Sequence, residues 1–418
     1  MLKLTVTMGA KMKIRMAALR GLVVVGLLTM GVAAAGAEEM PTIRLGAAVS
    51  LSGKYSSNGV YTQNGYDLAV KQINARGGVK VGGKSYKLEI VYYDDESTPA
   101  RGSQLAERLI QQDGVKYLLG PYSSGLVEAM APVTEKYGVP MVEANGAAIS
   151  LFDKGYKYLF AVLSTTDQYL KGAVDIAAHR AADPTRIKIA MAFENDPFSQ
   201  DVRAGVLEDA KKYGMKIVVD DKLPPELSDM SATLTKVKLL KPDILIVSGH
   251  DKGAATAIRQ IADQRVNVPM LAMTHCDSAQ IAEKFGKAAE YTLCAAQWAP
   301  SLAYADDLFG KASDYAKLYE SIYHEPAPYQ AAESSAAVEV YADAFTRAGS
   351  LDPKAVRDAL AVTNLASFYG PIKFDETGKN VDKPTILFQV QGGKYVVVYP
   401  AKWGEAKLLT PTPSWDKR

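Results

Sequence analysis

Residues 113–125 read DGVKYLLGPYSSG, and this stretch decides the fold. The apolar run Tyr117–Leu119 predicts a short buried strand. The glycine and proline that follow predict a turn, and Ser124 is a residue type that often begins a helix. The N-terminus of a helix has unpaired N–H groups and favours an anion. The stretch therefore predicts a strand–loop–helix unit whose loop can bind a carboxylate.

The same alternation of short apolar runs and helix-period segments extends from about residue 43 to residue 293. Strands that alternate with helices predict parallel sheets covered by helices on both faces. A chain of 418 residues is also longer than one core usually holds. We therefore predict an α/β fold of two doubly wound parallel-sheet lobes, with ligands bound near the carboxyl ends of strands. The main expected strands are 43–49, 88–93, 117–119, 187–193, 216–220, 243–248 and 270–274, and the main expected helices are 199–213, 229–240, 252–264, 312–323 and 331–348.

Residues 1–37 have the three parts of a secretory signal. A basic segment without acidic residues is followed by an uncharged run, residues 21–37, which ends in Ala35-Gly36-Ala37. This run is shorter than the roughly 20 apolar residues that a membrane span needs. We expect cleavage near Ala37 and a periplasmic protein. Neither cysteine lies at the end of the run, so lipidation is not expected.

The charge balance excludes some partners. The chain has 48 basic and 46 acidic residues, and five of the basic ones belong to residues 1–37, which have no acidic residue. The rest of the chain is therefore slightly acidic. No basic patch interleaved with aromatic residues occurs, so nucleic acid is not an expected partner. No later segment is long and apolar enough to cross a bilayer.

Cysteine and carboxylate motifs give no prediction of a metal or cofactor. Cys276 and Cys294 are the only cysteines, and they either form a disulfide in an oxidising compartment or remain buried thiols. Three adjacent carboxylates, Asp94-Asp95-Glu96, are interpreted as a solvated loop, because they cannot all reach one ion without help from the backbone. The glycine-rich residues 77–83 follow a helix and lack the dinucleotide-binding spacing, so they are interpreted as a turn.

Several motifs between residues 50 and 146 resemble, in order and spacing, the N-terminal lobe of type I periplasmic solute-binding proteins of ABC importers. The branch in question includes the leucine/isoleucine/valine-binding proteins. The resemblance implies a cleft between two lobes that closes on a small solute. It also implies docking of a monomeric protein on a permease and ATPase complex. The motifs are Ser50-Leu51-Ser52-Gly53, Leu68-Ala69-Val70, Ile73-Asn74-Ala75-Arg76-Gly77-Gly78, Asp94-Asp95, Pro99, Asp113-Gly114-Val115, residues 119–125 and Gly138-Val139-Pro140.

The lobe boundaries also follow from the resemblance, which implies three crossings between the lobes. These are expected near Ser164-Thr165, near Gln297-Trp298 and within residues 370–374. The N-terminal lobe would then comprise residues 38–164 plus 298–372. The C-terminal lobe would comprise residues 165–297 plus 373–418, after a signal peptide at residues 1–37.

The resemblance implies ligand contacts from two loops of the N-terminal lobe. Ser124 matches the family's serine that binds the ligand carboxylate, although serine is also an ordinary helix cap. Ala147 stands where the family usually has a threonine, so its backbone N–H and the carbonyl of Asn145 would bind instead. An ordinary turn at Asn145-Gly146 is the alternative.

The C-terminal lobe departs further from the family pattern. Thr274, with His275 beside it, stands where the family has a glutamate for the ligand's α-ammonium. An ammonium in a closed cleft needs a counter-charge. Either Asp277 supplies it, or Asp196 or Asp251 does, or the ligand has no α-ammonium.

Three ring side chains suit a flat or aromatic solute. The resemblance places Phe198 where relatives have an aromatic residue that stacks on the ligand, and Tyr122 at a side-chain-pocket position. His250 follows the expected strand 243–248, and each of the three could instead belong to the core or the surface. We therefore expect a hydrophobic or branched-chain amino acid, with an aromatic carboxylate, an amide or a urea-like solute as alternatives.

Passive binding for import is the expected function. A ligand sensor for a separate signalling partner is the alternative class. An enzyme is not expected, because neither a nucleophile elbow nor a His-Glu-x-x-His motif occurs.

Overall fold

The computed structural model describes residues 40–418. The expected signal peptide and its cleavage site fall on residues 1–37 and so lie outside this part of the chain. Within residues 40–418, no helix combines the length and the apolar character that crossing a membrane requires.

The first sheet has six strands in the order β2-β3-β1-β4-β5-β6. β1 lies at its centre and pairs in parallel with both β3 and β4. From Leu45 to Val49 the strand is buried, as expected for a sheet covered on both faces. Only β2 runs antiparallel to its neighbour. The strands are β1 (Thr42–Val49), β2 (Val79–Val81), β3 (Lys84–Asp94), β4 (Leu118–Leu119), β5 (Met141–Glu143) and β6 (Leu159–Ala161).

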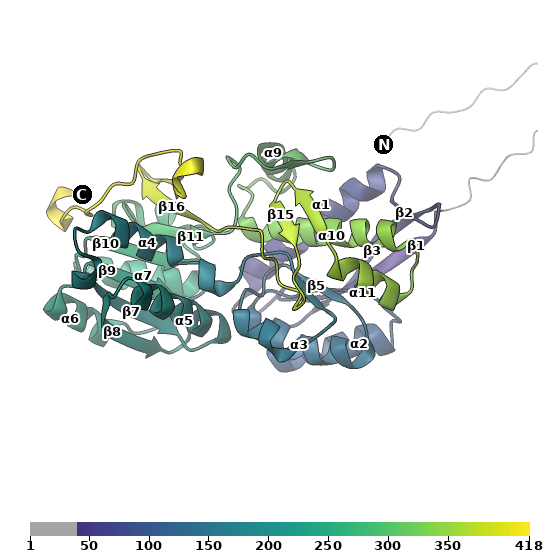
Figure 1. Cartoon of the computed structure of the whole chain (residues 1–418), viewed down its shortest axis with the longest axis horizontal. Coiled ribbons are helices and arrows are strands. Elements are labelled where there is room, and N and C mark those ends of the chain that lie inside the picture. Colours follow the sequence, from purple (N-terminus) through teal and green to yellow (C-terminus); the bar gives the residue numbers. More distant parts are fainter. Residues whose placement is uncertain (1–39) are drawn as a thin grey trace, which may run out of the picture. The chain divides into compact units, whose positions relative to one another are not determined.

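The second sheet has seven strands in the order β17-β16-β11-β10-β9-β7-β8. Its first five strands along the chain are parallel, and the two late strands are added antiparallel at one edge (Figure 1). Two small hairpins, β12–β13 and β14–β15, complete the strands. The bounds are β7 (Lys188–Glu194), β8 (Lys216–Leu223), β9 (Ile244–Ser248), β10 (Met270–Thr274), β11 (Leu293–Ala296), β12 (Ala305–Asp306), β13 (Gly310–Lys311), β14 (Asn364–Ser367), β15 (Gly370–Lys373), β16 (Ile386–Gln391) and β17 (Lys394–Tyr399).

Helices follow most of the parallel strands, and one late helix returns to the first sheet. α10 is almost entirely buried, and its Tyr341 hydroxyl donates to the carbonyls of Leu118 and Pro140. A Cβ at Gly65 of α1 would lie 2.2 Å from the Ala331 carbonyl oxygen. The close packing of α10 on α1 therefore requires glycine at that position. The helices are α1 (Ser56–Ala75), α2 (Pro99–Gln111), α3 (Ser124–Tyr137), α4 (Lys171–Arg180), α5 (Pro197–Lys212), α6 (Ser231–Leu240), α7 (Asp251–Asp263), α8 (Ile281–Phe285), α9 (Ala312–Tyr323), α10 (Tyr329–Ala348) and α11 (Pro353–Ala361).

The predicted fold class is confirmed, and two local interpretations are wrong. Asp95 is not in a solvated loop: it is fully buried and accepts hydrogen bonds from the Ser50 hydroxyl at 2.6 Å and the Ser97 N–H at 2.8 Å. Residues 77–83 are not merely a turn, because they contain β2. α10 also begins at Tyr329, two residues before the expected start, with Pro328 as its N-cap.

The predicted lobe boundaries remain a prediction. The first sheet uses strands from residues 42–161 and the second uses strands from residues 188–399. Near the expected crossings, buried side chains bond to one another: the Gln297 amide pairs with both backbone groups of Ser164, and the Ser164 hydroxyl donates to the Lys383 carbonyl.

Cys276 and Cys294 form a disulfide, which decides between the two alternatives that the sequence left open. Their Cα atoms are 5.5 Å apart, because Cys276 follows β10 and Cys294 lies in the adjacent strand β11. The bond closes a loop with a sequence separation of 18 residues.

We predict that the double variant Cys276→Ser, Cys294→Ser loses about 3 kcal/mol of unfolding free energy, because the open loop gains entropy in the unfolded chain. Urea unfolding measures the difference, and reductant should shift the wild-type midpoint without shifting that of the variant. Two titratable thiols in the denatured, unreduced wild-type protein would contradict the assignment.

Candidate functional site

A small cavity lies where loops from the carboxyl ends of strands in both sheets come together. Its volume is about 10 Å³, roughly the space of one water molecule. Residues after β4 and β5 form one wall, residues after β7, β9 and β10 form another, and α10 closes it. The lining residues are Tyr122, Ser123, Ser124, Asn145, Tyr169, Phe198, His250, His275, Tyr329 and Glu333.

Six of the eight residues predicted from sequence line this cavity, namely Tyr122, Ser124, Asn145, Phe198, His250 and His275. The other two lie outside its lining. Ala147 is buried, and its carbonyl accepts the Thr166 N–H. The Thr274 hydroxyl is bonded to the backbone of Gly249, to which it donates at 2.8 Å. The Thr274 hydroxyl is thus engaged within the protein, whereas the predicted contact from the Ala147 backbone N–H stays a prediction.

Tyr122 connects the two walls through both histidines. His275 Nδ1 lies 2.9 Å from the Gly249 carbonyl, so this nitrogen carries the proton. In the neutral ring, His275 Nε2 then accepts from the Tyr122 hydroxyl, 3.1 Å away. The tyrosine oxygen in turn accepts from His250 Nδ1 at 3.0 Å. The network thus assigns one direction to every proton along the chain from His250 to Gly249.

The charges beside this network give the two histidines opposite behaviour. Burial alone would lower the His250 pKa, but Asp196, whose Oδ1 lies 3.6 Å from His250 Nε2, raises it overall. His250 in turn lowers the pKa of Asp196, although burial alone would raise it. Among residues 40–418 no carboxylate pairs with His275, and burial and the nearby His250 charge lower its pKa to about 3. A protonated His250 and a neutral His275 fit the proton directions above.

Glu194, Asp196 and His250 are the group within residues 40–418 whose donor atoms could hold a metal, since all three lie within 4.8 Å of one another. Part of this group is already engaged within the protein, although Asp196 Oδ2 is buried without a hydrogen-bond partner among residues 40–418. Asp196 accepts the Ser199 N–H at 3.0 Å as the cap of α5 and pairs with His250. Burial raises the Glu194 pKa to about 7. This carboxyl can therefore remain protonated and uncharged beside the charged Asp196 and His250.

The first wall presents the N-terminus of α3. The Ser124 hydroxyl oxygen accepts the Ala148 N–H at 3.0 Å, which leaves its own hydrogen free to donate into the cavity. Ser123, the residue before the helix, has φ +106°, a region that non-glycine residues rarely adopt. Such strain is typical of functional loops.

Aromatic rings make up most of the remaining lining. Tyr169 meets Phe198 edge to face with centroids 5.2 Å apart, and Phe198 meets His275 at 5.1 Å. Tyr329 lies 6.4 Å from His275. The arrangement offers an apolar surface beside the polar groups of α3.

Sequence reasoning missed four lining residues: Ser123, Tyr169, Tyr329 and Glu333. Three come from segments far from the matched motifs, so spacing could not place them. One signal was available for Glu333, which interrupts the run of small residues at the start of a helix that the sequence assigned to the first lobe. A glutamate in a buried helix requires a polar partner.

Two α/β sheets that share a cavity at their strand ends are the arrangement expected of a two-lobed solute-binding protein. The chain belongs to the periplasmic binding protein family, whose model matches residues 42–394. This confirms the resemblance seen in the sequence.

Individual relatives agree with this assignment. The leucine-, isoleucine-, valine-, threonine- and alanine-binding protein of Pseudomonas aeruginosa is 24% identical over 343 residues, 82% of this chain and 88% of the relative. The substrate-binding protein LivJ of Streptococcus pneumoniae, solved with isoleucine, has a TM-score of 0.74 and 23% identity, covering 88% of this chain and all of that one. A solute-binding protein of R. palustris solved with benzoate has a TM-score of 0.72 and 22% identity, covering 85% and 95%. These structures show the shared fold.

We predict that the two cavity histidines titrate on opposite sides of the ordinary histidine pKa of about 6.5. His250 should stay protonated above the ordinary histidine range of about 6.5, because Asp196 favours its charged form. His275 should stay neutral down to pH 5. Histidine side-chain NMR in the ligand-free protein measures both, with His250→Gln and His275→Gln variants for assignment. Two histidines that both titrate near 6.5 would contradict the network.

Proposed function

We propose that the protein is the periplasmic solute-binding component of an ABC importer, and that it binds a hydrophobic or branched-chain amino acid. The observation that carries this proposal is the composition of the cavity, which combines an anion-binding helix terminus with aromatic walls from both sheets. The partners would be a permease and its ATPase, and the protein would bind its solute without changing it.

The carboxylate of the amino acid would lie at the start of α3. The Ser124 hydroxyl has its hydrogen available, and the first N–H groups of a helix have no partner within it. Together they supply donors and a favourable dipole for a negative group.

The apolar side chain of the solute would pack against the rings. Tyr169, Phe198 and Tyr329 provide that surface, and they come from both sides of the cavity. Contact with both sides is what links binding to closure of the lobes.

Binding requires the lobes to open first. The cavity is far smaller than the roughly 300 Å³ or more of typical small-molecule sites. Tyr122 also bonds directly to His250 and His275. A solute would separate these side chains and supply polar groups in their place, so the same residues would serve as a latch in its absence.

An aromatic carboxylate is the second candidate. The number of rings around the cavity favours it, and the R. palustris neighbour was solved with benzoate. Such a solute would also place its carboxylate at Ser124. It would have no α-ammonium, so no counter-charge would be needed.

We predict that Ser124→Ala weakens binding of the solute about 10- to 100-fold, the effect of losing one hydrogen bond to a charged group. Calorimetry on refolded, ligand-stripped protein measures Kd for hydrophobic amino acids and aromatic acids. Ser321→Ala, on the exposed surface of α9, is the matched control and should bind as wild type does. Wild-type affinity in Ser124→Ala, or no binding of any of these solutes to the wild type, would count against the proposal.

A further inference from the structure

Glu333 is a buried carboxyl that lines the cavity. It lies in the second turn of α10 with 1% of its surface exposed. The Tyr369 hydroxyl donates to its Oε2 at 3.0 Å. Burial raises the Glu333 pKa well above its ordinary value, which shows how poorly its surroundings compensate a negative charge.

No basic side chain within residues 40–418 lies within 4.0 Å of the Glu333 carboxyl oxygens. The nearby cation is Lys383, which is 4% exposed and does not line the cavity. Its ammonium donates instead to the Gln297 carbonyl and lies 4.2 Å from the centre of the Tyr369 ring. Burial lowers the Lys383 pKa to about 7. This side chain is therefore only partly charged near neutral pH and compensates a charge on Glu333 incompletely.

Asn145 offers a second acceptor beside Glu333. The Ser334 hydroxyl donates to the Gln330 carbonyl at 2.6 Å, so its oxygen can only accept from Asn145. The group of Asn145 that faces Ser334 at 3.0 Å must therefore be the amide NH₂. This fixes the amide orientation and leaves Asn145 Oδ1 without a partner among residues 40–418, although the residue is only 7% exposed and lines the cavity.

Two acceptors in one buried cavity call for a donor with a positive charge. An unsatisfied buried acceptor and an uncompensated buried carboxylate are both costly, and one ammonium group would satisfy both. Tyr169 and Tyr329 line the same cavity, and aromatic rings add attraction for a cation.

The second-sheet carboxylates do not occupy this position. Asp196 is engaged with His250 and the N-terminus of α5, and neither Asp251 nor Asp277 lines the cavity. Asp277 instead borders a separate cavity beside Tyr61 and Trp298.

We infer that Glu333, together with Asn145 Oδ1, binds the amino group of the solute and thereby selects zwitterionic amino acids over carboxylic acids that lack an amino group. The inference rests on the proposed function. The counter-charge for the ammonium would then come from α10 and not from the second sheet. Both charged ends of the solute would contact residues packed on the first sheet.

The test compares each amino acid with the same molecule lacking its amino group. The probes are L-leucine with 4-methylpentanoate, and L-phenylalanine with 3-phenylpropanoate. Glu333→Gln keeps the side-chain shape and the acceptor for Tyr369 but removes the charge. It should raise the Kd of the amino acid at least about 30-fold and leave the Kd of the desamino acid within about threefold.

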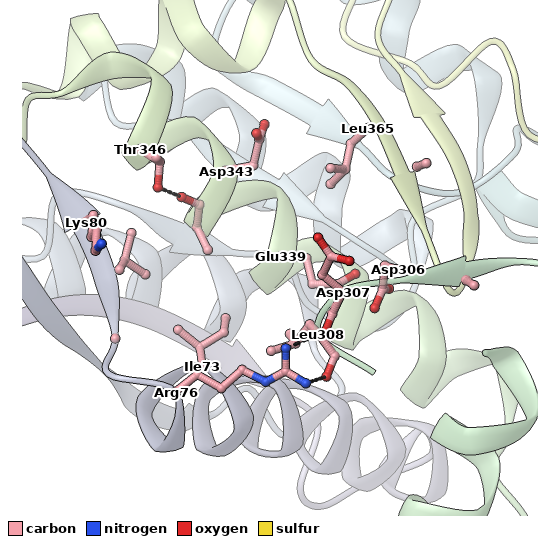
Figure 2. Close-up of a pocket in the computed structure, with 15 residues that line it drawn as sticks. Ile73, Arg76, Lys80, Asp306, Asp307, Leu308, Glu339, Asp343, Thr346 and Leu365 are labelled. Carbon is pink, nitrogen blue, oxygen red and sulfur yellow. Dashed lines mark hydrogen bonds between the residues drawn. The ribbon is translucent and has the colours of Figure 1, made fainter. Parts of the chain in front are cut away.

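Glu339→Gln is the matched control. Glu339 is a second buried glutamate on α10, bonded to Ser367, and it lines a different cavity of about 760 Å³ with Asp306 and Asp343 (Figure 2). Its substitution should leave both affinities unchanged. Asn145→Ala gives an independent test if Glu333→Gln unfolds, and it should also weaken amino-acid binding selectively.

The outcomes separate the inference from the proposed function. If the wild type binds none of the four probes, the proposed function fails and the inference fails with it. If the wild type binds only the desamino acids, solute binding stands and the inference is overturned. If Glu333→Gln or Asn145→Ala retains the wild-type preference for the amino acid, another group recognises the ammonium.

Discussion

The arrangement depends on a buried polar joint centred on Gln297. Its side-chain amide accepts the Ser164 N–H at 3.1 Å and donates to the Ser164 carbonyl at 2.9 Å. The Tyr369 hydroxyl lies 3.3 Å from the same amide oxygen, and Lys383 donates to the Gln297 backbone carbonyl. Buried groups that are paired in this way favour a single geometry, because most alternatives leave a donor or acceptor unpaired. Ser164, Gln297 and Tyr369 lie at or beside the three positions where the sequence predicts crossings between the lobes.

The joint reaches the cavity through Tyr369, whose hydroxyl bonds Glu333. The carboxyl that lines the cavity and the hydrogen bonds of the joint therefore form one network. In a region of low dielectric, a charge at one end changes the favourable proton positions along the whole network. A charged group in the cavity would therefore affect the hydrogen bonds around Gln297.

The sequence predicted those residues of the site that come directly after a strand. Ser124, His250 and His275 each follow a strand, so their common location was predictable from the rule that ligands gather at the carboxyl ends of parallel strands. Tyr329 and Glu333 were not predictable in this way. They depend on the packing of α10 against α1 and the first sheet, which involves residues more than 200 positions away and the close approach at Gly65. From the sequence, a counter-charge was expected only in the second lobe, because the resemblance implied one there. The burial of Asp95 was not predicted for a similar reason. Its carboxylate accepts a hydrogen bond from Ser50, which lies 45 residues earlier in the chain.

The most direct test of the account is a crystal structure of the protein with a bound amino acid. Recognition of the ammonium by Glu333 predicts a ligand nitrogen within about 3.2 Å of both the Glu333 carboxyl and Asn145 Oδ1, with the ligand carboxylate at the Ser124 hydroxyl. A ligand nitrogen held by Asp196, Asp251 or Asp277 would contradict it, as would an amino acid bound outside the cavity.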